Sequence, residues 1–154
     1  MSSHLDYEIN KELGECYLFM GDLDKAKEYY DKAASSNGIH PDPYLGLATI
    51  AVQKGELDTA HQLYAKAAGI DADEKSLAGM ALVEMETGRH QEAFEHFSKA
   101  LDHNPESIIS VSMLVQLGHV LGRLEEVMPR LESYLAVDPT NSEVRYSLAG
   151  CLTC

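Results

Sequence analysis

The chain has 154 residues, enough for one domain with a sizeable core, and 25 Asp and Glu against 12 Lys and Arg give it a net charge of −13. This acidic excess argues against a nucleic-acid-binding protein, which needs clustered Lys and Arg, and against electrostatic docking on an anionic membrane. A content of 45% hydrophobic and 24% charged residues is typical of a globular chain rather than a disordered one. The most apolar stretch, residues 108–121, is too short and too polar to span a bilayer.

The N-terminus and the cysteines indicate the cellular compartment of the protein. The N-terminus has no basic start followed by an apolar run, so we expect no signal peptide. The cysteines are odd in number, Cys16, Cys151 and Cys154, and without a secretory signal this count indicates a reducing compartment. We therefore expect a cytoplasmic protein.

Four glycines recur at a nearly constant period, since Gly21, Gly55, Gly88 and Gly122 are spaced by 34, 33 and 34 residues. Glycine adopts left-handed backbone dihedrals without strain, so each is expected to end a helix. A small, a large and a small residue then follow at fixed offsets, on one face of the next helix. The triplets are Ala26, Tyr30, Ala33; Ala60, Tyr64, Ala67; Ala93, Phe97, Ala100; Val127, Leu131, Tyr134. The last repeat departs from the order, because Val127 and Tyr134 replace its two alanines.

In chain order, the repeats predict pairs of amphipathic helices joined by tight turns. A ninth helix restarts the pattern of a first helix near the C-terminus, and the chain ends without its partner helix. The expected helices are about 5–20, 23–36, 41–54, 57–69, 74–87, 90–103, 107–121, 124–136 and 141–152. We expect one domain, 1–154, with repeats at about 7–40, 41–73, 74–107 and 108–141 and a half-repeat or capping helix at 142–154.

This pattern resembles the tetratricopeptide repeat (TPR) family. The resemblance rests on Leu13-Gly14-x-x-Tyr17, on Gly21 with its small–large–small triplet, and on their copies over nearly the whole chain. It implies an all-α solenoid of antiparallel helix pairs, a right-handed superhelix of about four and a half repeats and nine helices. One departure from the family is Glu84, which stands where a large apolar residue is usual.

Catalytic and metal-binding motifs are absent from the sequence, so we expect no enzyme activity and no cofactor or metal. Cys151 and Cys154 form a lone Cys-x-x-Cys on a predicted terminal helix, and we interpret them as small helix residues. Glu92 and His96 share a predicted helix face, but one such pair is not a metal site. Cys16 is expected to be a small core residue of the first helix.

In the TPR family the first helix of each pair lines a concave groove that holds the ligand, so the resemblance implies a partner-binding groove here. Carried over by position, the groove residues are Glu8, Lys11, Glu12, Glu15, Phe19, Asp42, Leu45, Thr49, Val52, Gln53, Lys75, Ala78, Leu82, Met85, Glu86, Ser112, Gln116 and His119, with Ile109 beside them.

One subclass of the family grips the C-terminal carboxylate of a chaperone through a basic and Asn-rich clamp. The positions that correspond to this clamp are Lys11, Glu15, Gly46, Lys75 and Gly79. Only the two lysines fit, and Glu15 would repel a carboxylate. The sequence therefore argues against this role.

We interpret the chain as a non-catalytic protein–protein interaction scaffold that binds a peptide or helix of a partner protein. The acidic groove favours a partner with apolar anchors and basic flanks. Two alternatives stay open: a bacterial secretion-type TPR chaperone, and the TPR segment of a larger multidomain enzyme such as a glycosyltransferase or methyltransferase. If the chain is cut from a longer protein, the C-terminal helix with Leu148, Cys151 and Leu152 is expected to promote self-association.

Overall fold

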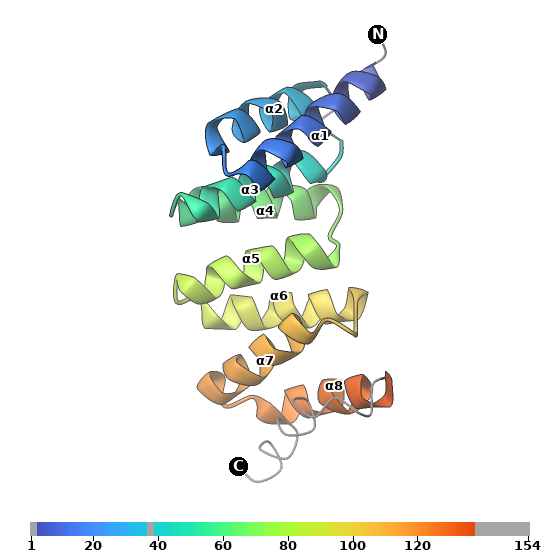
Figure 1. Ribbon diagram of the computed structural model, residues 1–154. Helices are drawn as coiled ribbons and strands as arrows, with labels where there is room; N and C mark the ends of the chain where they lie inside the picture. The colour runs from blue at the N-terminus through green and yellow to red at the C-terminus, as the bar shows by residue number, and fades with distance from the viewer. Residues whose placement is uncertain (1–2, 37–38, 138–154) are drawn as a thin grey trace. The chain divides into compact units, whose positions relative to one another are not determined.

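A computed structural model describes residues 3–36 and 39–137 of the chain (Figure 1). Within these ranges all regular structure is helical, and each helix lies within two residues of its predicted bounds. The predicted ninth helix, 141–152, and with it the half-repeat at 142–154, lies outside the described residues. The eight helices are α1 (Ser3–Met20), α2 (Leu23–Ser36), α3 (Asp42–Gln53), α4 (Leu57–Ile70), α5 (Glu74–Glu86), α6 (His90–His103), α7 (Ile108–Leu121) and α8 (Leu124–Val137).

The periodic glycines make the turns within the helix pairs, as predicted. All four have positive φ, between 68° at Gly122 and 82° at Gly21, a region that side-chain-bearing residues rarely adopt. The residue after each glycine donates its backbone N–H to the carbonyl five residues earlier, as Glu56 does to Ala51 at 2.8 Å. This bond satisfies a carbonyl that the helix end would leave unpaired. The same closure therefore sets the same tight turn in every pair.

The chain forms two compact units, whose boundary falls between Val83 and Glu84, inside α5. In the first unit α1 packs against α2, α2 against α3, and α3 against α4. In the second unit α6 packs against α7, and α7 against α8. Neighbouring helices within each unit thus pack in chain order, as a solenoid requires.

The small residues of the triplets form the predicted core. Ala26, Ala60 and Ala93 are fully buried, and Val127 is 1% exposed. A methyl group at these positions lets the helix axes approach closely, and a large side chain from a neighbouring turn fills the remaining space. The large residues Tyr30, Phe97 and Leu131 are also buried, whereas Tyr64 is only half-buried. The residues that close the triplets, Ala33, Ala67, Ala100 and Tyr134, are buried as well.

The expectation that Cys16 is a core residue is wrong, because its side chain is exposed. One repeat later the equivalent residue is Ile50, which is 2% exposed because α2 packs on that side of α3. Among the described residues no helix precedes α1, so nothing covers the corresponding side of α1. The repeat period identified a helix face that is buried at Ile50 of α3, but no described helix covers the same face of α1.

Candidate functional site

The candidate site is the surface formed by the first helices of the pairs, which we call the first-helix surface. In the first unit it comprises residues of α1, of α3 and of α5 up to Val83. None of the predicted groove residues is buried. In this unit Glu8, Lys11, Leu45, Thr49 and Ala78 are half-buried, and Glu12, Glu15, Phe19, Asp42, Val52, Gln53, Lys75 and Leu82 are exposed.

Carboxylates dominate the N-terminal part of the first-helix surface. The Nζ of Lys11 lies 3.3 Å from Glu8, 3.9 Å from Glu12 and 3.9 Å from Asp42, so it joins α1 to α3. Glu15, which is also on α1, brings the number of carboxylates to four. Because one ammonium group stands among four carboxylates, the surface carries a net negative charge and attracts cations.

Tyr30 explains why two glycines occur on the helices that flank it. Its ring lies against Gly14 of α1 and Gly46 of α3; a Cβ on Gly14 would be 3.0 Å from the ring, and one on Gly46 would overlap it. Burial, with the added effect of the charges of Glu15, Asp42 and Glu12, raises the pKa of Tyr30 to about 12. The phenol therefore stays neutral beside the carboxylates at any physiological pH.

The structure gives a physical reason why the carboxylate-clamp interpretation fails. Lys11 is already surrounded by three carboxylates. The clamp positions Gly46 and Gly79 cannot carry polar side chains, since the rings of Tyr30 and Tyr64 occupy the space of their Cβ atoms. Only Lys75 remains exposed as a cation at a clamp position.

Sequence reasoning missed the buried phenol at the start of this surface. Tyr7 is 2% exposed, and its ring centroid lies 4.5 Å from that of His40, just before α3. Burial, followed by the charges of Asp42 and Glu8, raises its pKa to about 12. The pair anchors the N-terminal turns of α1 to the start of α3. Because a lone tyrosine ahead of the first repeat glycine has no periodic signal, pattern reasoning could not identify it.

In the second unit the predicted groove residues lie on the last turn of α5 and on α7. Met85 and Ser112 are half-buried, while Glu86, Gln116 and His119 are exposed. Ile109 is 58% exposed at the start of α7. This part of the first-helix surface is therefore less acidic than that of α1 and α3.

The departure at Glu84 marks a buried polar pair. Glu84 is 1% exposed, and its Oε1 lies 2.6 Å from Nδ1 of His96 on α6. The sequence placed His96 beside Glu92, whereas the structure pairs it with Glu84. The substitution of an expected apolar residue by Glu was the available signal, since a buried carboxylate requires a polar partner.

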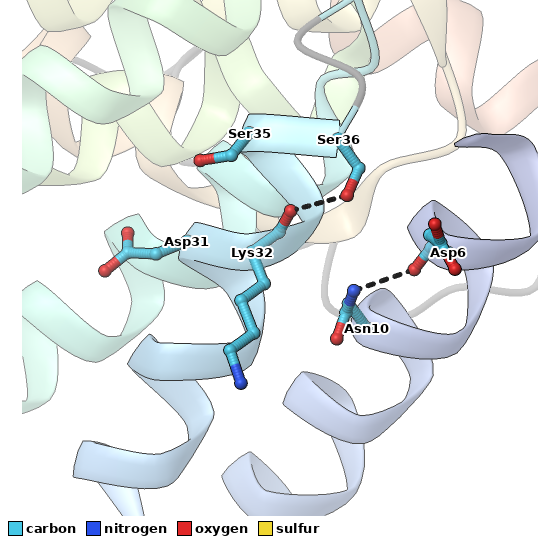
Figure 2. A pocket seen from close by; sticks show the side chains of 6 residues that line it. All are labelled: Asp6, Asn10, Asp31, Lys32, Ser35 and Ser36. Carbon is cyan, nitrogen blue, oxygen red and sulfur yellow. Dashed lines mark hydrogen bonds between the residues drawn. The ribbon is translucent and has the colours of Figure 1, made fainter.

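A shallow hollow between α1 and α2 is lined by polar side chains that bond locally, such as Asn10 to the carbonyl of Asp6 at 2.9 Å and Ser36 to that of Lys32 at 2.9 Å (Figure 2). Within residues 3–36 and 39–137, no cluster of three His, Cys, Asp or Glu could hold a metal ion, and no helix could cross a membrane. Cys151 and Cys154 lie outside the described residues.

Comparisons with known proteins agree with the repeat pattern. Residues 18–82 match the family model of a tetratricopeptide repeat. Over 115 residues the chain is 31% identical to the BBSome complex member BBS4 of Bos taurus. The matched region covers 72% of this chain and 22% of that protein. The chain thus spans about a fifth of this curated relative's length.

Solved structures share the fold. A structure of Pseudomonas aeruginosa pilF superposes with a TM-score of 0.78 at 20% identity, covering 99% of this chain and 70% of that one. The second TPR domain of human RPAP3, solved in complex with the HSP70 peptide SGPTIEEVD, superposes with a TM-score of 0.69 at 19% identity, covering 75% and 97%. The family match over residues 18–82, together with the 33- to 34-residue period and the paired helices, identifies tetratricopeptide repeats in this chain, and the solved structures show the same fold.

Proposed function

We propose that the chain is a non-catalytic protein-interaction module that binds a peptide or helix of a partner protein on its first-helix surface. The observation that carries the proposal is the charge of this surface, where Lys11 is held by Glu8, Glu12 and Asp42, and Glu15 adds a further carboxylate. Complementarity favours a partner with basic residues. The half-exposed Leu45 and the exposed Val52 and Leu82 offer contacts for apolar anchors.

The ligand chemistry proposed here differs from that of a structural neighbour. The RPAP3 domain holds a peptide with the acidic sequence SGPTIEEVD. An acidic peptide would meet repulsion from Glu12 and Glu15 in this chain, and Lys11 is already neutralised. We therefore assign the module to basic, not acidic, partner segments.

Selection from a random peptide library displayed on phage, with the whole chain as bait, tests the proposal. Enriched peptides are expected to combine Lys or Arg with large apolar residues. Their binding should be lost in the double variant Glu12→Lys, Glu15→Lys, because reversal of two charges makes the surface repel them. The matched control is Asp58→Lys, which reverses an exposed charge on α4 outside this surface.

Two results would contradict the proposal. Enrichment of acidic peptides would show that the charge of α1 and α3 does not select the ligand. Basic peptides that bind the double variant as well as the unchanged chain would place the binding site on another surface.

A further inference from the structure

One face of α1 is apolar and accessible, and we call it the end face. It comprises Ile9, Leu13, Cys16 and Met20, whose spacing of three or four residues places them on one side of the helix. Ile9 is 45% exposed and Met20 is 75% exposed. The first three residues of the end face line a hollow of about 290 Å³ together with Glu8 and Glu12, so the end face borders the first-helix surface there.

In later repeats the same face of the first helix is covered by the second helix of the preceding pair. α2 packs against α3, and α6 packs against α7. The residues that correspond to Ile9, Leu13 and Cys16 are all buried there: Pro43, Leu47 and Ile50 on α3, and Ser110, Leu114 and Leu117 on α7. The end face therefore has the position and the residue pattern of a helix-covered surface, and no described helix covers it.

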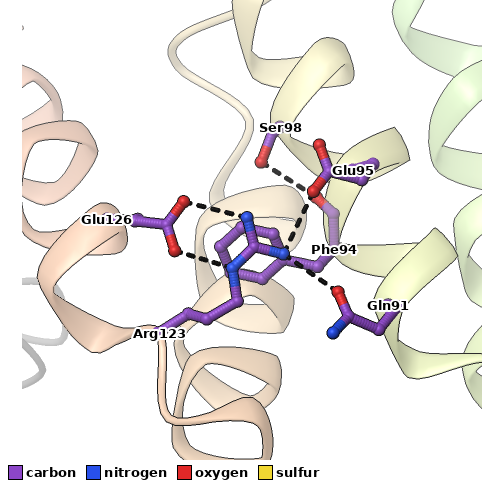
Figure 3. A network of polar contacts seen from close by, with 6 residues as sticks. All are labelled: Gln91, Phe94, Glu95, Ser98, Arg123 and Glu126. Atoms are coloured by element: carbon purple, nitrogen blue, oxygen red, sulfur yellow. Dashed lines mark hydrogen bonds and ion pairs between the residues drawn. The ribbon is translucent and has the colours of Figure 1, made fainter.

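The second unit shows how charge matches a covering helix to the pair that it covers. Arg123, at the turn after α7, donates to Glu95 at 3.0 Å and to Gln91 at 3.2 Å, both on the covering helix α6 (Figure 3). It also donates to Glu126 of α8 at 2.6 and 2.8 Å, and its guanidinium carbon lies 3.9 Å from the centroid of the Phe94 ring. A cation of the covered pair thus meets an acidic residue of the covering helix.

The first pair carries the opposite charges at these positions. Asp22 stands at the position of Arg123, and Lys25 at that of its partner on α8. The ammonium group of Lys25 lies over the ring of Tyr17 on α1, 5.3 Å from its centroid. An acidic residue of a covering helix would therefore meet the carboxylate of Asp22, whereas a basic residue would be attracted to it.

A second cation of the covered helices is replaced as well. On α3, Lys54 pairs at 3.4 Å with Asp24 of the covering helix α2. Met20 stands at the position of Lys54 on α1. With Glu8 and Glu12 beside the hollow, the end face has acidic and apolar groups at its edges. Its charge therefore favours a basic covering helix over an acidic one.

We propose that the end face binds an amphipathic helix of a partner protein, in the role that α6 has on α7, with Lys or Arg at the positions of Gln91 and Glu95. The apolar side of this helix would cover the end face, and its basic residues would pair with Asp22. Charge opposes a second copy as the occupant. Two copies joined antiparallel through their end faces would bring Glu8 and Glu12 of one next to the same residues of the other.

Methyl NMR of the whole chain, titrated with a synthetic peptide, tests this proposal. The probe has the sequence of α6, residues 90–103, with Gln91→Lys and Glu95→Lys, and the matched peptide has the unchanged sequence. The methyl resonances of Ile9 and Met20 are expected to shift saturably with the lysine peptide. The unchanged peptide should bind about tenfold more weakly, because its acidic residue meets the carboxylate at the end of α1.

Variants of the chain locate the site. Asp22→Arg should reverse the preference, so that the unchanged peptide binds more tightly than the lysine peptide. The fold accepts arginine at this position, since Arg89 and Arg123 occupy it in the third and fourth pairs. Ile9→Asn should weaken binding of the lysine peptide about tenfold, whereas Ile70→Asn, at a similarly exposed residue of α4, should leave it unchanged. If Ile9→Asn does not fold, the preference of Asp22→Arg decides the test.

Three results would overturn the proposal. The first is equal binding of the two peptides to the unchanged chain, or the same preference in Asp22→Arg as in the unchanged chain. The second is a set of shifts confined to Val52 and Leu82, which would place the peptide on the first-helix surface instead. The third is a shift of Ile9 and Met20 that grows with protein concentration in the absence of peptide, which would identify a second copy as the occupant.

Discussion

At the scale of single residues, glycines on the neighbouring helices α3 and α4 have opposite steric surroundings. A Cβ on Gly46 of α3 would overlap the ring of Tyr30, whereas one on Gly69 of α4 would meet no atom within 4 Å. Gly46→Ala is therefore expected to destabilise the protein by about 1–3 kcal/mol through overpacking. Gly69→Ala should stabilise it by about 0.5–1 kcal/mol, because alanine is the better helix former. Urea unfolding followed by circular dichroism measures both changes.

The control for this prediction removes the ring. In a Tyr30→Ala background the cost of Gly46→Ala should vanish, since the Cβ then enters open space. An equal cost in both backgrounds would show that the ring of Tyr30 is not what excludes a side chain at residue 46.

The small residues of the repeat give a second prediction at this scale. Ala60 of α4 is fully buried in a cluster with Ala51 and Val83, whereas Ala65 of the same helix is exposed. Ala60→Leu is expected to cost about 1–3 kcal/mol, while Ala65→Leu should change stability by less than about 0.5 kcal/mol. Similar melting temperatures of the two variants would mean that the repeat register is wrong.

The sequence allowed most of this core to be predicted because its residues recur. Four copies of one spacing fix which side of each helix is buried, and the burial of Ala26, Ala60 and Ala93 confirms it. Features that occur once could not be predicted in this way. The contact of Tyr7 with His40 and the partner of Glu84 both depend on how neighbouring helices meet, which no period records.

At the scale of helices, the pair between Glu84 on α5 and His96 on α6 replaces an apolar contact by a buried polar one. His96→Ala is expected to cost about 1–3 kcal/mol, because the buried Oε1 loses this hydrogen-bond partner. Glu84→Leu restores an apolar side chain and leaves His96, which is 24% exposed, in reach of water. It should therefore be neutral or stabilising, by up to about 4 kcal/mol.

Chemical unfolding of the two variants under identical conditions separates these expectations. If Glu84→Leu is the more destabilised of the two, the polar pair stabilises the second unit more than apolar packing would. The substitution of Glu for an apolar residue would then be a source of stability, contrary to the argument above.

Helix contacts also explain why the predicted groove residues could be located but not assigned a ligand. Their position on the first helices follows from the 3.6-residue period, and the structure leaves all of them at least partly exposed. Whether a charged side chain of this surface is already in an ion pair depends instead on contacts between helices. Lys11 counted as a clamp cation in the sequence, whereas in the structure it joins α1 to Asp42 of α3.

At the scale of the whole molecule, the net charge of −13 should govern how fast a basic partner arrives rather than how long it stays. Raising the salt concentration from 50 to 500 mM is expected to lower the association rate of a selected basic peptide by about tenfold, because exposed charges are screened. The dissociation rate should change much less, since it depends on apolar contacts that salt does not screen. Surface plasmon resonance measures both rates.

Leu82→Ala should raise the dissociation rate by about fivefold or more if Leu82, which is 41% exposed, contacts an apolar anchor. Ile70→Ala is the matched control, because Ile70 is 37% exposed but lies on α4, outside the first-helix surface. A peptide whose dissociation accelerates with salt as strongly as its association slows would be held by exposed ion pairs, and the apolar residues of the first-helix surface would then have no part in retaining it.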